Sequence, residues 1–167
     1  TQANINHVRS AMKNLELLVV QELFMTETAK LAHVVLPAGC FFEKDGTFTN
    51  AERRVRRLNQ AIPLHKGTKH DWEIICLIAN AMGYPMHYNH PGEIMVEIAS
   101  LTPEFAGIDF KRLEGDGLVW PVWDKKHPGT PILHKDTFTR GKGRFNDLLY
   151  TPSEELPDDS YPLCLTT

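Results

Sequence analysis

Polar side chains that could bind a ligand follow a short apolar run near the start of the sequence. Gln21 and Glu22 come directly after the run at residues 17–20, and Thr26 follows closely. A carboxylate at the end of a strand can accept hydrogen bonds from a ribose diol or a guanine edge. Thr26 can cap a helix, or it can bind a phosphate or sugar through its hydroxyl group. The pattern allows a nucleotide site, and it equally allows Glu22 to be a solvated loop acid.

Two further residues could complete such a site. Lys44 lies in the sequence Glu43-Lys44-Asp45-Gly46, where the glycine would let the backbone approach a ligand closely. Its ammonium group could bind a diphosphate or a base carbonyl, although a surface lysine is the simpler interpretation. Asp71 can cap the helix that begins there, or it can accept hydrogen bonds from guanine N1–H and the exocyclic amine.

Metal sites and catalytic sites have less support in the sequence than a nucleotide-binding site. Cys40, Cys76 and Cys164 are widely spaced and form no CxxC pair, so they encode neither a zinc site nor an iron–sulfur cluster. We interpret them as free thiols of a reducing cytosol. The eight histidines form no metal-ligand pattern, and no Walker loop, Rossmann glycine fingerprint or GxSxG motif is present. We therefore assign no catalytic residue and no metal ligand.

A basic cluster at residues 52–57 holds four of the eighteen lysines and arginines. It could contact nucleic acid, pair with acids of a neighbouring domain, or frame an anionic cofactor. The formal net charge of -3 provides no field that attracts nucleic acid, and no apolar run is long enough to span a bilayer. We expect no nucleic-acid partner, no membrane insertion and, because no signal peptide is visible, a cytoplasmic location.

Apolar periodicity predicts the elements that would position these residues. Runs at 17–20 and 33–36 predict two neighbouring parallel strands, with a helix over 4–15 before them and another over 27–32 between them. From 38 to 69 we expect little regular structure and a ligand-covering loop.

The second half of the sequence predicts two more helices and a looser tail. One helix begins at Asp71, with Gly83 as its left-handed C-terminal cap and with an inward face formed by Ile74, Ile75, Ile78 and Met82. The next helix, over 92–101, places Ile94, Ile98 and Leu101 on one face.

Beyond Pro103 we expect a short helix over 109–114, a strand over 145–150 and an acidic, proline-bearing linker over 151–162. The expected fold class is α/β. It is a three-layer, doubly wound, mostly parallel sheet of Rossmann-like type, incomplete at its N-terminus and followed by an irregular, loop-rich tail.

The order of these segments resembles one family, the molybdopterin oxidoreductases, and within it the formate dehydrogenase alpha (catalytic) subunit. The matching segments cover nearly the whole chain, and their combination in this order is highly specific. They are LLVVQELFMTETAKLAHVVLPA, EKDGTFTNAERRVRR, HDWEIICLIANAMGYP, GLVWPVWDKKHPGTPILH, FTRGKGRF and YPLCLTT.

The resemblance implies a bis(molybdopterin guanine dinucleotide) cofactor that holds molybdenum or tungsten, and oxidation of formate to CO2 by the intact subunit. It implies that one guanosine half of the cofactor contacts Gln21, Glu22, Thr26, Lys44 and Asp71. Glu22 stands where the family commonly has aspartate, which moves the carboxylate by one methylene. His33 also replaces a usual aspartate, so a salt bridge at that position is not expected to be kept.

The resemblance further implies a fragment of a larger subunit. Residues 1–102 would be part of a cofactor-binding domain, 103–150 a loop-rich extension of it, and 151–167 a linker and the first strand of a C-terminal β-barrel. The residues of a 4Fe-4S cluster, the metal ligand and the formate site would lie upstream, so the chain alone should have no formate dehydrogenase activity. Its expected partners are the remaining domains of the subunit and electron-transfer subunits.

Two alternatives stay open at this point. The chain could come from another molybdopterin oxidoreductase, such as nitrate reductase or the large subunit of a quinone-linked complex. It could also be a non-catalytic interaction module, in which the basic cluster docks a partner subunit or nucleic acid.

Overall fold

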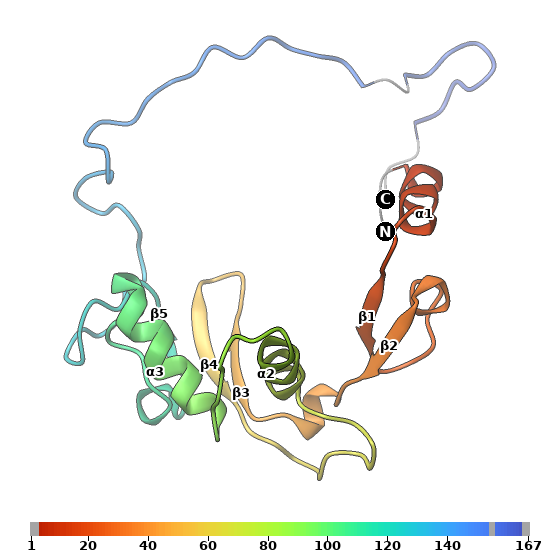
Figure 1. The fold of residues 1–167 in the computed structure, drawn as a ribbon. Coiled ribbons are helices and arrows are strands. Elements are labelled where there is room, and N and C mark those ends of the chain that lie inside the picture. The colour runs from red at the N-terminus through yellow and green to blue at the C-terminus, as the bar shows by residue number, and fades with distance from the viewer. Residues whose placement is uncertain (1–3, 154–155, 165–167) are drawn as a thin grey trace. The chain divides into compact units, whose positions relative to one another are not determined.

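The computed structural model describes residues 4–153 and 156–164 and divides the chain into two units, Thr1–Pro131 and Ile132–Thr167. Every α-helix and β-strand of the described residues lies in the first unit (Figure 1). These elements are α1 (Ile5–Lys13), β1 (Val19–Glu22), β2 (Val34–Pro37), β3 (Gly46–Thr49), β4 (Arg54–Leu58), α2 (Asp71–Ala81), α3 (Pro91–Leu101) and β5 (Leu118–Val119).

Strands β1 and β2 form a two-stranded parallel sheet, as the two apolar runs predict. In the register, Val19 lies opposite Val34 and Glu22 lies opposite Pro37. Gln21 and Glu22 are the last residues of β1 rather than the first residues after it. The connection between the strands contains a 3-10 turn at Ala29–Leu31 in place of the expected α-helix. The fold class is thus mixed α/β.

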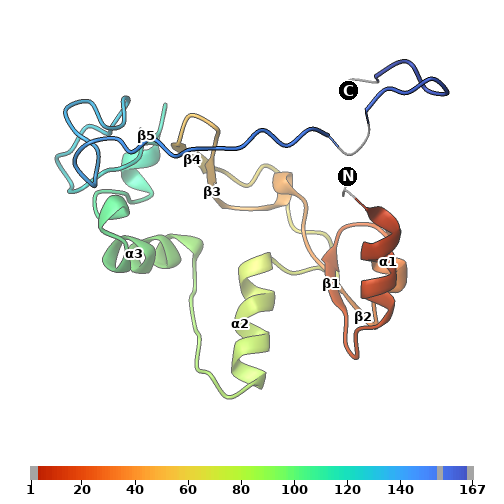
Figure 2. The same ribbon diagram turned by 90° about the horizontal axis from the view of Figure 1, so that it is seen from above.

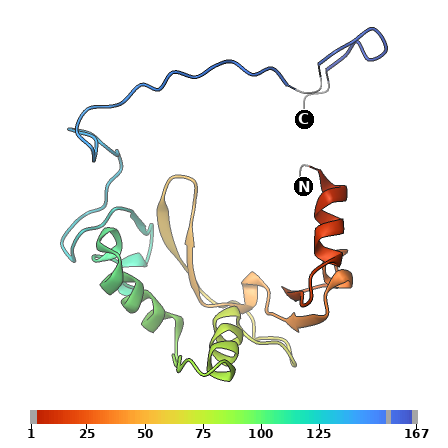
Figure 3. The same ribbon diagram turned by 45° about the horizontal axis from the view of Figure 1, so that its top comes forward.

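The expectation of little regular structure over 38–69 is wrong. This segment contains the antiparallel hairpin of β3 and β4, which β5 extends to three strands (Figure 3). Val55, the second residue of β4, is 1% exposed and belongs to the main core. The other fully packed members of this core are Met95, Ile108, Leu113 and Val122.

The two later helices exist, but of the residues predicted to face inward only Ile74 is buried. They are joined by an extended segment (Figure 2). In α2, Ile74 and Cys76 are buried, whereas Ile75 and Ile78 are 55% and 44% exposed. Gly83 has a φ of 84°, which confirms the predicted left-handed position after the helix.

Met82 is exposed as well, so it too departs from the predicted inward face of α2. In α3, the residue that reaches the core is Met95. The predicted face of Ile94, Ile98 and Leu101 lines an open pocket of about 230 Å³ instead.

The second unit carries no helix or strand among its described residues. The strand expected over 145–150 is therefore absent, and Phe145 is fully exposed. Of the predicted terminal strand, Tyr161 to Cys164 have no strand conformation, and residues 165–167 lie outside the described part. Within 4–153 and 156–164, no helix combines the length and the hydropathy needed to cross a membrane.

Arg53, from the basic cluster, ties the hairpin to the segment that follows β5. Its guanidinium group donates hydrogen bonds to the carbonyl oxygens of Trp120, Thr130 and Pro131, the last two at 3.1 and 3.0 Å. Its backbone has a φ of 66°, which few non-glycine residues adopt. Arg53 is therefore a structural residue, and its donors are used within the chain.

Glu43 anchors the loop between β2 and β3 although it carries a charge and is only 8% exposed. Its carboxylate accepts hydrogen bonds from the backbone N–H groups of Cys40 at 2.6 Å and His65 at 2.9 Å. The Cys40 N–H lowers the pKa of Glu43 below its ordinary value of 4.5, burial opposes this effect, and the His65 N–H adds to it.

Replacing Arg53 should destabilise the fold, because three carbonyl groups lose a charged donor. We expect Arg53→Ala to lower the free energy of unfolding by about 2 kcal/mol or more, measured by urea denaturation of the chain. Arg56→Ala is the matched control, since Arg56 is exposed and, within the described residues, its side chain forms no hydrogen bond or ion pair. An equal loss in both variants would contradict the role of Arg53.

Stability should also depend on the ionisation of Glu43. Because folding lowers its pKa, the stabilisation is present above about pH 4.5 and is lost as the pH falls below that value. We expect Glu43→Gln to lower the melting temperature at pH 7 and the difference from wild type to narrow on acidification to pH 3. Glu16→Gln, at an exposed position, should leave the whole profile unchanged. A difference that stays constant with pH would argue against an ionised Glu43.

Candidate functional site

Three of the five predicted site residues contact one another. The side-chain amide of Gln21 donates a hydrogen bond to Oδ1 of Asp71, and Nζ of Lys44 forms an ion pair with Oδ2 of the same carboxylate. The three residues come from the end of β1, the loop before β3 and the start of α2. The structure thus brings together side chains that are far apart in the sequence.

Backbone pairing explains why the start of α2 lies beside the ends of the parallel strands. Lys69 donates its N–H to the carbonyl of Pro37 at 3.3 Å and accepts a hydrogen bond from Gly39 at 3.2 Å. Ala38 in turn donates to the carbonyl of Glu22 at 3.4 Å. Asp71 follows Lys69 by two residues, so this pairing places its carboxylate next to Gln21.

Asp71 is the first residue of α2 and not its N-cap, which corrects one of its two predicted roles. The N-cap is His70, whose backbone N–H is bound by the carboxylate of Glu73 at 2.9 Å. Because Asp71 does not cap the helix, both of its oxygens are available to other partners. An acidic residue in the first turn is also favourably placed with respect to the helix dipole.

Glu22 and Thr26 make local hydrogen bonds. Oε1 of Glu22 accepts from the Leu23 N–H at 2.8 Å, and Oγ1 of Thr26 accepts from the Ala29 N–H at 3.2 Å. Thr26 thus binds the first residue of the 3-10 turn, but the N-cap is Thr28, whose side chain forms no capping hydrogen bond. Within the described residues, neither side chain bonds to the Gln21–Lys44–Asp71 group.

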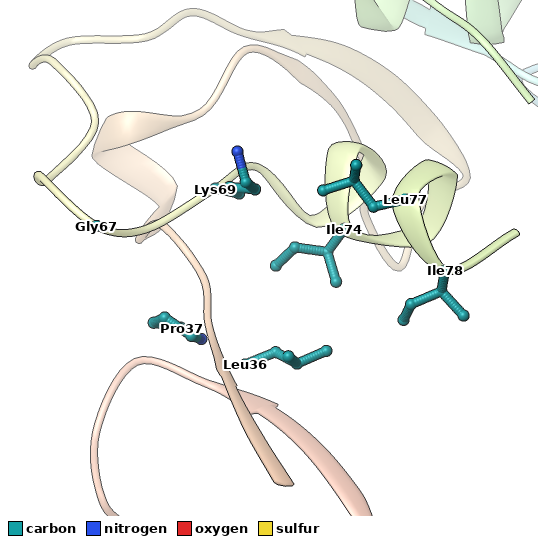
Figure 4. A pocket seen from close by; sticks show the side chains of 7 residues that line it. All are labelled: Leu36, Pro37, Gly67, Lys69, Ile74, Leu77 and Ile78. Carbon is teal, nitrogen blue, oxygen red and sulfur yellow. The ribbon is translucent and has the colours of Figure 1, made fainter. Parts of the chain in front are cut away.

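An apolar cavity of about 250 Å³ lies between the end of β2 and the side of α2 that carries Ile74 and Ile78. Figure 4 shows Leu36 and Pro37 on the strand facing Ile74 and Ile78 on the helix. Gly67, Lys69 and Leu77 complete the lining. Sequence reasoning missed Gly67 and Lys69 because no motif marks the segment that pairs with β2.

A second, more polar cavity of about 320 Å³ is lined by the sequence neighbours of Lys44 and Asp71. Its lining includes Asp45, His70 and Trp72. The rings of His70 and Trp72 are nearly parallel, and their centroids lie 6.2 Å apart. Gln60, Glu73, Asn89, His90 and Pro91 form the remainder. Asp45 follows the predicted site residue Lys44 in the sequence, so its position could have been anticipated. No feature of the sequence indicates that His90 lies in this cavity.

The described residues contain no group of three or more histidine, cysteine or acidic side chains arranged to hold a metal ion. Cys40 is half-buried, Cys76 is buried and Cys164 is exposed, each as a free thiol. The chemistry that these residues offer is recognition by hydrogen bonds and charge.

Comparison with known proteins bears on the family that the sequence resembles. Residues 1–81 match the family model of the molybdopterin oxidoreductases. The chain is 48% identical over 169 residues to the F420-dependent formate dehydrogenase 2 subunit alpha of Methanococcus maripaludis, covering 99% of the chain and 25% of that protein. It is 51% identical over 146 residues to a putative formate dehydrogenase of Staphylococcus aureus, covering 85% of the chain and 14% of that protein.

A solved structure shares the fold of part of the chain. Acetylene hydratase from Pelobacter acetylenicus superposes with a TM-score of 0.53 at 24% sequence identity, over 65% of this chain and 15% of that one. The chain spans only about a quarter of the length of the relatives that match it over nearly all its residues. The chain is thus similar to the molybdopterin oxidoreductases over residues 1–81 and to formate dehydrogenase alpha subunits over nearly its whole length.

Proposed function

We propose that this chain supplies one wall of the guanine dinucleotide site in the catalytic subunit of a formate dehydrogenase. The observation that carries the proposal is the convergence of Gln21 and Lys44 on the carboxylate of Asp71, next to the end of β1. Ligands of open α/β sheets bind at the carboxyl ends of parallel strands. The relatives named as formate dehydrogenases support formate as the substrate of the intact subunit, which it would oxidise to CO2.

The chemistry of the three side chains fits a guanine nucleotide. An ionised carboxylate has two acceptor oxygens, which match the N1–H and the exocyclic amine of guanine. Lys44 offers a compact positive charge to a base carbonyl or a phosphate, and it offsets the charge of Asp71 while no ligand is bound. Gln21 can exchange its hydrogen bond with Asp71 for one with the base.

Glu22 and Thr26 complete the proposed site from the neighbouring turn. Glu22 has a second carboxylate oxygen, beyond the one that binds Leu23, which can accept from a ribose hydroxyl. When bound, the bis(molybdopterin guanine dinucleotide) cofactor would supply the molybdenum or tungsten centre at which two electrons are taken from formate. The residues of this chain would hold and orient its nucleotide end.

The proposal extends to the rest of the subunit. Val19 and Val34 of the parallel pair are 44% and 42% exposed, whereas parallel sheets are normally covered on both faces. We infer that further strands and helices of the same subunit complete a doubly wound sheet here. A 4Fe-4S cluster, electron-transfer subunits and a cytoplasmic location belong to the same proposal.

The proposal can be tested in a complete subunit, made by putting this chain in place of the matching quarter of the Methanococcus maripaludis relative. Removing the charge of Asp71 with Asp71→Asn should weaken nucleotide binding roughly tenfold to a hundredfold, the usual effect of losing charged hydrogen bonds. We expect purified Asp71→Asn protein to contain less metal per subunit and to yield less GMP after acid hydrolysis, which cleaves the diphosphate bond of the cofactor.

Asp116→Asn is the control for this experiment, because Asp116 lies in an exposed loop of the same unit. It should leave the content of GMP and metal at the level of the unmodified chimera. A full complement of guanine nucleotide in the Asp71→Asn protein would remove the site assignment.

A further inference from the structure

Asp45 follows Lys44 directly and joins three separate parts of the fold. Its Oδ1 lies 2.8 Å from Nη1 of Arg57 on β4, an ion pair without hydrogen-bond geometry, because Nη1 donates to the Gly46 carbonyl. Its Oδ2 forms a hydrogen bond with Nε2 of His90, the N-cap of α3, also at 2.8 Å. The side chains of Asp45 and Arg57 are only 25% and 16% exposed, so solvent screens this pair less than it screens a surface pair.

Both partners of Asp45 are themselves held in place. Nδ1 of His90 accepts a hydrogen bond from the Gly92 N–H at 3.0 Å, which leaves the proton on Nε2 to be donated to Asp45. The guanidinium carbon of Arg57 lies 3.8 Å from the ring centre of Phe110, a cation–π contact. The ring of His90 meets the same phenyl ring edge-on, with centroids 5.5 Å apart.

The backbone at Lys44 links this cluster to the candidate site. Lys44 has an extended conformation, with φ of -111° and ψ of 146°. Successive side chains of an extended chain point to opposite sides. Asp45 reaches Arg57 and His90 on one side, while Lys44 reaches Asp71 on the other. Glu43, bound to the Cys40 and His65 backbone, fixes the chain just before Lys44.

We propose that Asp45, held by Arg57 and His90, is a positioning residue that aims Lys44 at the guanine nucleotide. The inference rests on the proposed function of the Asp71 site and extends it, because Asp45 acts through Lys44 and not by touching the ligand. It assigns Arg57, a member of the basic cluster, to the support of the site.

A double-mutant cycle in the chimeric subunit tests this inference. Asp45→Asn should lower the GMP and metal content about threefold to tenfold, as expected for the loss of a partly buried charged contact. If Asp45 acts through Lys44, the double variant Lys44→Met/Asp45→Asn should retain as much cofactor as Lys44→Met alone. A purely structural role would make the two losses add.

Asp109→Asn is the matched control, since Asp109 also forms a 2.8 Å ion pair, with Lys125, and its side chain is 30% exposed. It should not lower the cofactor content. A second cycle combines Arg57→Met with Lys44→Met and compares the cofactor content in the same way. It tests the positioning role even if the Asp45→Asn protein misfolds. Melting temperatures of all variants identify any loss that is due to unfolding.

The outcomes separate this inference from the proposed function. Cofactor loss in Asp71→Asn and Lys44→Met, with full cofactor in Asp45→Asn and Arg57→Met, would overturn the positioning role alone. Additive losses in the cycle would overturn it as well. Full cofactor in Asp71→Asn would overturn the proposed function, and the positioning role with it.

Discussion

The carboxylate of Asp71 is the interaction on which the described arrangement of the site depends. One oxygen binds the end of a parallel strand through Gln21, and the other binds the loop before the hairpin through Lys44. Because the side chain of Asp71 is 41% exposed, these partners fix the place of the carboxylate more than they offset its burial. Glu43 and Asp45 are more buried: each oxygen of Glu43 accepts a backbone N–H, and Asp45 binds His90 through one oxygen and has Arg57 beside the other.

The parts of the fold that could be predicted are those with local signals. The apolar runs predicted β1 and β2, and Gly83 marked the end of α2. The hairpin was not predicted because β4 has the sequence RVRRL. Only Val55 in it has the apolar side chain of a buried strand residue, and the arginines resemble a solvated basic cluster. Arg53 and Arg57 instead stabilise the fold through carbonyl groups, an aspartate and aromatic rings. Such pairing is decided by residues distant in the sequence.

For the candidate site, residue types and their order predicted Gln21, Lys44 and Asp71, which the structure brings into contact. The inward face assigned to α2 was wrong in part, because helical periodicity gives a face but not what covers it. Asp45 and His90 could not be paired from the sequence, since 45 residues separate them. The comparisons support the family independently of these details.

Gln21 and Asp71 are 50 residues apart, and this separation has a consequence for the order of folding. Contacts between such distant residues form late, after the loop between them has been closed at a cost in entropy. The contact between Gln21 and Asp71 is therefore absent from a chain that has formed only its local helices and turns. A nucleotide that binds the proposed site stabilises the folded chain but not the unfolded one, so cofactor supply would shift the folding equilibrium itself.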